Sequence, residues 1–109
     1  MEITDPSILR DLLRSDGPVL VEIGSAYCPP CWLLEDVMKE LEEEFRGRVE
    51  FYRVDVGIDP ELMRRFAVQS IPRVLLIRGG RVVGEFEGYY PRDAVRLWLV
   101  RCLSSAERG

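Results

Sequence analysis

Residues 27–32 read Tyr-Cys-Pro-Pro-Cys-Trp and stand between an apolar run, residues 19–23, and a long amphipathic segment. The run predicts a strand that ends just before the two cysteines, and the segment after them predicts a helix. If that helix begins at Pro29, Cys28 and Cys31 lie three residues apart on one face, with Cβ atoms about 5–6 Å apart. Small torsional changes bring such a pair within disulfide reach, so a bond can open and close there without a change of fold.

The cysteine pair also lies where a helix start favours a reactive thiol. A thiol attacks only as its thiolate, and the free N–H groups of a helix start stabilise an anion at the N-cap. Cys28 occupies that position, followed by Pro29, which suits the first helical position. Because Pro30 has no N–H either, the groups of Cys31 and Trp32 are left to face the Cys28 sulfur. We therefore expect Cys28 to be the exposed nucleophile and Cys31 the resolving thiol.

A Cys-x-x-Cys pair by itself also fits other sites. It could be half of a zinc or iron–sulfur site, or two small buried apolar residues. The sequence has no histidine and a single further cysteine, Cys102, on the apolar face of the last expected helix. A complete four-ligand site would need a second subunit or carboxylates. We therefore expect no metal, and we expect Cys102 to be a core residue.

Apolar spacing and capping residues predict the order of the elements. Helices are expected to begin at Asp5-Pro6, at the cysteine pair, at Asp59-Pro60 and at Pro91, and strands to cover residues 19–23, 49–56, 74–77 and 82–86. Gly17-Pro18, Gly47 and Ala67 are expected to end the first three helices. A helix between the first two strands makes them parallel, and Gly79-Gly80 predicts an antiparallel hairpin.

Several landmarks beyond the cysteines resemble the thioredoxin superfamily, in particular its small members. Residues 27–31 stand where the family has Trp-Cys-Gly-Pro-Cys, and Glu22, six residues before Cys28, stands where it usually has a buried aspartate. The match runs from about residue 5 to about residue 103, and its other landmarks are Val54-Asp55, Asp59-Pro60, Ser70-Ile71-Pro72, Gly79-Gly80 and Gly88. The resemblance implies an α/β thioredoxin fold, with a central mixed β-sheet flanked by helices on both faces. We expect one domain over residues 1–109, with residues 104–109 as a frayed tail.

Glu22 has two interpretations, because a charge in an apolar strand is costly unless it is paired or neutralised. Its side chain could reach an edge and pair with a cation such as Arg53. The resemblance instead implies that Glu22 lies buried behind Cys31 with a raised pKa. There it would act, through water, as proton acceptor and donor for that thiol.

The resemblance also implies a docking surface around Cys28. Pro72 would be a cis proline packed against the cysteine pair, with the Ile71 backbone free to pair with an extended substrate segment. Pro72 would also block metal from the thiols. The substrate-binding residues would be Tyr27, Pro29, Pro30, Ile71, Pro72 and Gly88.

Composition is typical of a globular protein with one core. The chain has 109 residues, 47% of them hydrophobic. Its 15 basic residues are scattered among 19 acidic ones, with a net charge of −4, so we expect no nucleic-acid binding. No apolar run has the roughly eighteen residues of a membrane span, and Met1-Glu2 lacks the basic region of a signal peptide. We expect a cytoplasmic protein with no membrane association, where such a cysteine pair favours redox or metal chemistry.

The expected function is that of a thiol:disulfide oxidoreductase. It would reduce protein disulfides through a dithiol/disulfide cycle of Cys28 and Cys31 with a mixed-disulfide intermediate. No dissociable cofactor is implied; the partners would be disulfide-containing proteins and a thioredoxin reductase or another dithiol as electron donor. The reverse direction would make the protein an oxidant or isomerase. A different class of function is a binding adaptor that uses the surface around Tyr27, Ile71 and Pro72.

Overall fold

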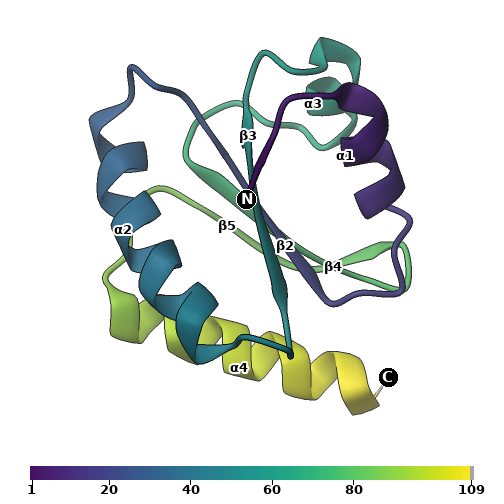
Figure 1. Cartoon of the computed structure of the whole chain (residues 1–109), viewed down its shortest axis with the longest axis vertical. Coiled ribbons are helices and arrows are strands. Elements are labelled where there is room, and N and C mark those ends of the chain that lie inside the picture. Colours follow the sequence, from purple (N-terminus) through teal and green to yellow (C-terminus); the bar gives the residue numbers. More distant parts are fainter. Residues whose placement is uncertain (109) are drawn as a thin grey trace.

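The structure, a computed structural model, describes the backbone of residues 1–108 and the side chains of residues 1–105. Its elements are β1 (Glu2–Ile3), α1 (Pro6–Leu12), β2 (Val19–Gly24), α2 (Pro29–Glu44), β3 (Glu50–Asp55), α3 (Pro60–Arg65), β4 (Arg73–Arg78), β5 (Arg81–Glu87) and α4 (Arg92–Arg108). The strands form a five-stranded sheet in the order β1-β3-β2-β4-β5 (Figure 1). The central strand is therefore β2, which leads into the cysteine pair.

The sheet is mixed, as the sequence predicts. Strand β3 runs parallel to β2, with Glu22 opposite Arg53, and β1 runs parallel to β3. Strand β4 is antiparallel to β2 on its other side and continues into β5. The hairpin turns at Gly79 and Gly80, which both have positive φ. The predicted class, a mixed sheet flanked by helices on both faces, is confirmed.

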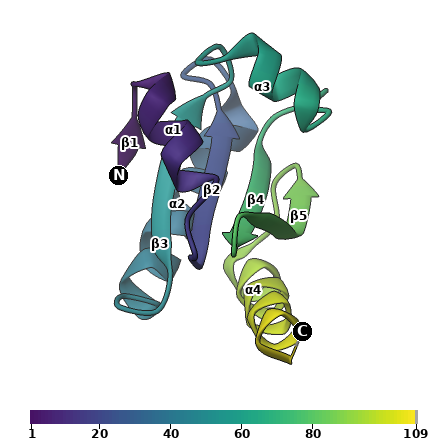
Figure 2. The same ribbon diagram turned by 90° about the vertical axis from the view of Figure 1, so that its right-hand side faces the viewer.

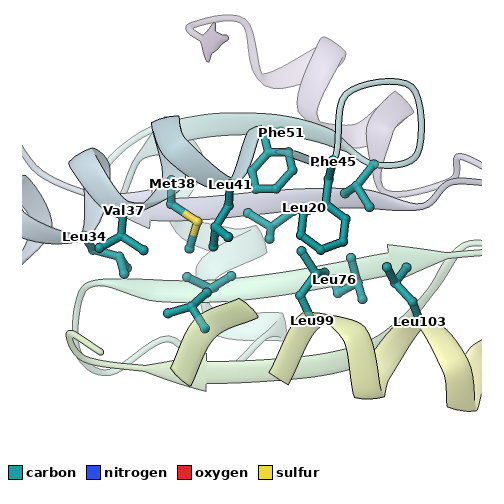
Figure 3. Packing of buried hydrophobic residues seen from close by; sticks show 13 residues of the cluster. Leu20, Leu34, Val37, Met38, Leu41, Phe45, Phe51, Leu76, Leu99 and Leu103 are labelled. Carbon is teal, nitrogen blue, oxygen red and sulfur yellow. The ribbon is translucent and has the colours of Figure 1, made fainter. Parts of the chain in front are cut away.

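Two apolar clusters fix the helices to the two faces of the sheet. On one face, Leu20 of β2 packs with side chains of α2 and α4, among them Leu41 and Leu99 (Figure 3). On the other face, Val21 of β2 belongs to a cluster with side chains of α1 and α3. Figure 2 shows how these two helices are arranged relative to the strands. Since side chains alternate along a strand, Leu20, Glu22 and Gly24 face α2 and α4.

Two of the predicted helix starts are held by aspartate caps followed by proline. The Asp5 carboxylate accepts a hydrogen bond from the Ser7 N–H at 2.9 Å. The Asp59 carboxylate accepts one from the Leu62 N–H at 3.2 Å. Each cap satisfies a backbone donor that has no partner within the helix, and removing one typically costs about 1 kcal/mol.

Helix ends differ from the prediction more than helix starts do. Helix α1 ends at Leu12, well before Gly17-Pro18. Helix α2 ends at Glu44. Phe45, the residue that follows, is fully buried, and its carbonyl accepts the N–H of Val49 in the next turn. Gly47 lies within that turn, with a φ of 82°. Glycine therefore marks these turns without setting the last helical residue.

The two ends of the chain also depart from the prediction. Strand β1 was not predicted, because two residues carry no period and its place depends on pairing with Arg53 and Val54. Helix α4 begins at Arg92 and continues through Arg108, into the segment from residue 104 that was expected to be a frayed tail. No glycine or proline interrupts the chain between Leu103 and Arg108. Gly109 lies outside the described residues.

We predict that Gly84→Ala destabilises the protein through one close contact. Gly84 of β5 faces α4, where an added Cβ would overlap the Cys102 Sγ and lie 3.3 Å from Trp98 Cζ2. Overpacking of this kind costs about 1–3 kcal/mol. Urea unfolding at neutral pH would measure the loss.

The matched control is Cys102→Ala, alone and combined with Gly84→Ala. The double variant should recover most of the stability that Gly84→Ala loses, because the overlapping sulfur is gone. An equal loss with and without Cys102 would contradict this account.

Cys102 is half-buried against the same cluster as Leu20, and burial raises the pKa of its thiol, in keeping with its prediction as a core residue.

Candidate active site

The two cysteines lie where β2 meets the first turn of α2. Cys28 is the N-cap of α2 in extended backbone conformation, and Pro29 and Pro30 follow it. The pair forms a disulfide, with Cα atoms 5.2 Å apart. Cys31 is 1% exposed, whereas Cys28 is half-buried. The predicted order, an outer Cys28 and an inner Cys31, is what the structure shows.

The helix start supplies one N–H to the Cys28 sulfur instead of the two expected. The Cys31 N–H donates to Cys28 Sγ at 3.3 Å and lies 3.0 Å from the Cys28 carbonyl oxygen. The Trp32 N–H donates to the Cys28 carbonyl at 3.2 Å. Because Trp32 stands four residues after Cys28, its N–H closes the first helical hydrogen bond and is not left for the sulfur.

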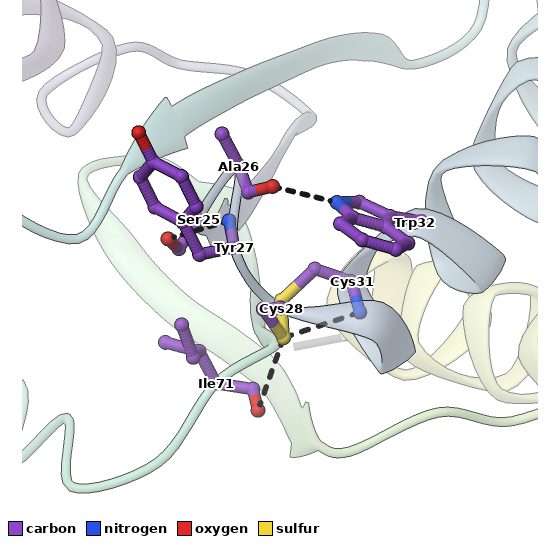
Figure 4. Close-up of a disulfide and its surroundings, with 7 residues drawn as sticks. All are labelled: Ser25, Ala26, Tyr27, Cys28, Cys31, Trp32 and Ile71. Atoms are coloured by element: carbon purple, nitrogen blue, oxygen red, sulfur yellow. Dashed lines mark hydrogen bonds between the residues drawn. A yellow bond between two sulfur atoms is a disulfide. The ribbon is translucent and has the colours of Figure 1, made fainter.

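Two contacts that the sequence analysis did not anticipate lie around the loop before Cys28. The Trp32 indole N–H donates to the Ala26 carbonyl at 2.9 Å, which ties the loop to α2 (Figure 4). A Cβ added to Gly24 would lie 3.2 Å from Cys31 Sγ, so the end of β2 and the inner cysteine are in close contact. The available signals were an indole donor in the first turn and a glycine at the end of an apolar strand.

The Ile71–Pro72 peptide bond is cis, as predicted, and it brings a second backbone segment to the disulfide. Cys28 Sγ lies 4.0 Å from the Ile71 carbonyl oxygen, so in the dithiol form the thiol faces that carbonyl. The Pro72 carbonyl accepts the Gly88 N–H at 2.8 Å. Within residues 1–108, no other backbone group donates to or accepts from Ile71. Its backbone is therefore available beside the outer sulfur.

The remaining docking residues differ in exposure. Tyr27 is 91% exposed, and Pro29 and Pro30 are also exposed. Ile71 and Gly88 are half-buried. Pro72 is buried, so its ring presents little surface to a partner and its contribution is the placement of Ile71.

Glu22 is a buried carboxyl on the same face of the sheet as Gly24 and Cys31. Its side chain is 3% exposed, and its Oε2 atom has no hydrogen-bond partner. Desolvation raises its pKa from 4.5 to about 7; the nearby Arg53 lowers it and Glu35 raises it. Arg53 Nη1 forms its ion pair with Glu35, at 2.9 Å. The interpretation of an edge carboxylate paired with Arg53 is therefore wrong, and Glu22 is the buried carboxyl that the family resemblance implies.

Comparison with known proteins agrees with this geometry. A family model described as Thioredoxin matches residues 2–101. The chain belongs to the thioredoxin family. It is 32% identical to a thioredoxin of Alicyclobacillus acidocaldarius, over 94% of this chain and 97% of that protein. It is 31% identical to a thioredoxin of Chlorobaculum thiosulfatiphilum, over 86% of this chain and 87% of that protein.

A third relative places a similar sequence inside a larger protein. A bifunctional thioredoxin reductase/thioredoxin of Mycobacterium leprae is 38% identical over 81% of this chain, which spans 19% of that protein. Membership in the thioredoxin family, together with the bonded cysteine pair, identifies the chain as a thiol:disulfide oxidoreductase.

Two further features, a cluster of metal ligands and a membrane-spanning helix, are absent from the described residues. Among the described side chains, those of residues 1–105, no three of histidine, cysteine, aspartate or glutamate gather as a metal site. No helix within residues 1–108 combines the length and apolarity that crossing a membrane requires. The absence of a resident metal or dissociable cofactor stays a prediction.

We predict that Glu22→Gln gains stability relative to the parent as pH rises. A carboxyl with a pKa of about 7 in the folded state and 4.5 in the unfolded state binds its proton more tightly when folded. Its contribution to stability is therefore fully present below pH 4.5 and is lost as pH rises through 7. Because glutamine cannot ionise, the stability of the variant relative to the parent should grow by about 2 kcal/mol between pH 5 and pH 8.

Urea unfolding of the oxidised proteins at the two pH values checks this. Glu40→Gln on the exposed surface of α2 is the matched control and should show no such change. A stability difference between Glu22→Gln and the parent that is the same at both pH values would contradict a raised Glu22 pKa.

Proposed function

We propose that this chain reduces protein disulfides, with Cys28 as the attacking thiol and Cys31 as the resolving thiol. The observation that carries the proposal is the asymmetry of the pair. Cys28 is accessible at the N-cap of α2 and accepts the Cys31 N–H, whereas Cys31 is 1% exposed. A substrate disulfide can reach the first sulfur, and the second is held one turn inward, ready to attack it.

The reaction conserves thiols and electrons at each step. The Cys28 thiolate attacks one sulfur of a substrate disulfide, forms a mixed disulfide and expels the other substrate sulfur as a thiolate. The Cys31 thiolate then attacks Cys28 Sγ and releases the second substrate thiolate. The substrate gains two electrons and two protons, and the protein is left with the Cys28–Cys31 disulfide seen in the structure.

Glu22 would supply the proton transfer that Cys31 needs. A buried thiol must lose its proton to attack, and a group that titrates near neutral pH can accept that proton and return it. Glu22 has a pKa of about 7 and faces α2 from the strand position two residues before Gly24. We assign it as the proton acceptor and donor for Cys31, through water.

Substrate would dock as an extended segment beside Cys28. The Ile71 backbone lies next to the sulfur and is available for pairing, and strand addition of this kind gives affinity through backbone hydrogen bonds. Apolar contacts would come from the exposed side chains of Tyr27, Pro29 and Pro30. We assign docking to Tyr27, Pro29, Pro30, Ile71, Pro72 and Gly88.

The oxidised protein needs a source of electrons. The Mycobacterium leprae relative carries a thioredoxin reductase and a thioredoxin in one protein by its name. On this analogy we assign a thioredoxin reductase, or another dithiol, as the donor. We place the cycle in the cytoplasm, where thiols are kept reduced.

An adaptor that binds partners without turnover is the second candidate. It is favoured by three exposed apolar side chains next to the cysteines in the sequence. Tyr27, Trp32 and Leu33 are 91%, 51% and 58% exposed. Exposed apolar residues grouped in this way often mark a protein-binding surface. An adaptor would not need the cysteine asymmetry, which is why we favour the enzyme.

We predict that Cys31→Ser traps substrate and that Cys28→Ser does not. Without the resolving thiol the mixed disulfide on Cys28 persists, whereas without Cys28 no attack occurs. Both variants would be made with Cys102→Ala, so that no other thiol contributes. Non-reducing electrophoresis and intact mass after incubation with insulin would detect the adduct.

Two outcomes would contradict the assignment. Trapping by Cys28→Ser in place of Cys31→Ser would reverse the roles of the thiols. Retention of the same partners by the Cys28→Ser/Cys31→Ser double variant, from a parent that shows no insulin reduction, would favour the adaptor.

A further inference from the structure

Arg53 lies between two carboxyl groups and pairs with only one of them. It stands opposite Glu22 in the parallel ladder of β2 and β3, so the two side chains leave the sheet on the same face. Its guanidinium nevertheless forms its ion pair with Glu35 of α2, at 2.9 Å. Arg53 and Glu35 are 26% and 28% exposed, at the rim of the sheet, whereas Glu22 is buried with an unpartnered oxygen.

Because Arg53 pairs with Glu35, the buried Glu22 carboxyl has no cation as a partner. A guanidinium turned toward Glu22 would hold that group as a carboxylate with a depressed pKa, as neighbouring opposite charges do. Glu35 is partly exposed, so its carboxylate keeps contact with water and loses little hydration when it pairs with Arg53. Lys39, one turn along α2, also lies 3.8 Å from Glu35.

We propose that Glu35 is a positioning residue for thiol–disulfide exchange: by holding Arg53 at the rim of the sheet, it keeps Glu22 free to exchange a proton with Cys31. The inference rests on the proposed function. It adds a residue, Glu35, that keeps the proposed proton donor Glu22 free of an ion pair. Glu35 touches neither substrate nor the sulfurs, and it acts only through Arg53 and Glu22.

Arg53 and Glu35 are the charged groups that act on the Glu22 pKa, and α4 packs on this face of the sheet through apolar side chains such as Val95 and Leu99. From β3, Asp55 shares the face of Arg53, but its carboxylate accepts the Gly57 N–H at 2.8 Å. From β4, the residue opposite Glu22 is Val74, which carries no charge. From α2, Glu35 and Lys39 are the charged side chains of the rim, and Cys31 is in the disulfide. Arg53 is thus the cation that decides the state of Glu22.

The test compares the titration of Glu22 in three variants of the oxidised protein, in which Cys28 and Cys31 do not titrate. With side-chain ¹³C-labelled glutamate, the Glu22 resonance is identified by its loss in Glu22→Gln. Glu35→Gln should lower the Glu22 pKa by about one pH unit, because it removes a nearby anion and releases Arg53 toward Glu22. Arg53→Met should raise it, which gives a second variant with the opposite sign.

The control for charge alone is Asp36→Asn, at the exposed neighbouring position of α2. It removes a charge from the same helix without freeing Arg53, and it should leave the Glu22 titration nearly unchanged. The direct effect of the Glu35 charge on Glu22 is measured by Glu35→Gln in the Arg53→Met background, where it should lower the Glu22 pKa less than Glu35→Gln does alone. Unfolding midpoints of all variants verify that each is folded. A Glu22 titration that Glu35→Gln leaves unmoved, or moves by the same amount with and without Arg53, would overturn the proposal.

The same variants should move the reaction's pH dependence. In the parent, the rate of disulfide exchange should rise with pH over the range in which Glu22 loses its proton. This rise should be absent in Glu22→Gln. Glu35→Gln should shift the rise to lower pH, and Arg53→Met to higher pH. If the parent reduces no disulfide, the proposed function fails, whereas the titration in the oxidised protein still decides the role of Glu35.

Discussion

The first turn of α2 rests on the end of β2, where Gly24 leaves room for the inner cysteine. Strand β2 is buried along its whole length, between α2 and α4 on one face and α1 and α3 on the other. Its position therefore cannot shift without loss of both apolar clusters. The loop after β2 is short, and the Trp32–Ala26 hydrogen bond ties it to α2. The fixed position of β2 therefore fixes the positions of the two sulfurs.

The same burial creates the one costly group in the site. A carboxyl placed in this strand is desolvated, and the structure offers it no hydrogen-bond partner at Oε2 among the described residues. The energetic consequence is a group that changes charge near neutral pH, at the face where Cys31 lies. Stability at alkaline pH is thus reduced by Glu22, the residue that we propose as the proton acceptor and donor for Cys31. The Arg53–Glu35 ion pair lies at the rim of the sheet, and we propose that it preserves this arrangement by keeping the cation in contact with water.

Local chemistry made much of this predictable from the sequence. The strand before Cys28, the proline-started helix after it and the Asp5 and Asp59 caps all depend on neighbouring residues, and the structure has them. The cis bond before Pro72 and the buried state of Glu22 came from the family resemblance. Long-range pairings were not predictable, because they join elements that the sequence does not place side by side. The pairing of β1 with β3 and the Arg53–Glu35 ion pair are of this kind.

The central claim is that the Cys28–Cys31 pair works as a reductant. Its most direct test is a redox titration against dithiothreitol or glutathione buffers, with the thiols followed by alkylation and mass. The account predicts a strongly reducing midpoint, near the value of about −270 mV typical of reducing thioredoxins. A midpoint of about −180 mV or higher would mean that the dithiol is the favoured form, and it would contradict the account in favour of disulfide formation or isomerisation.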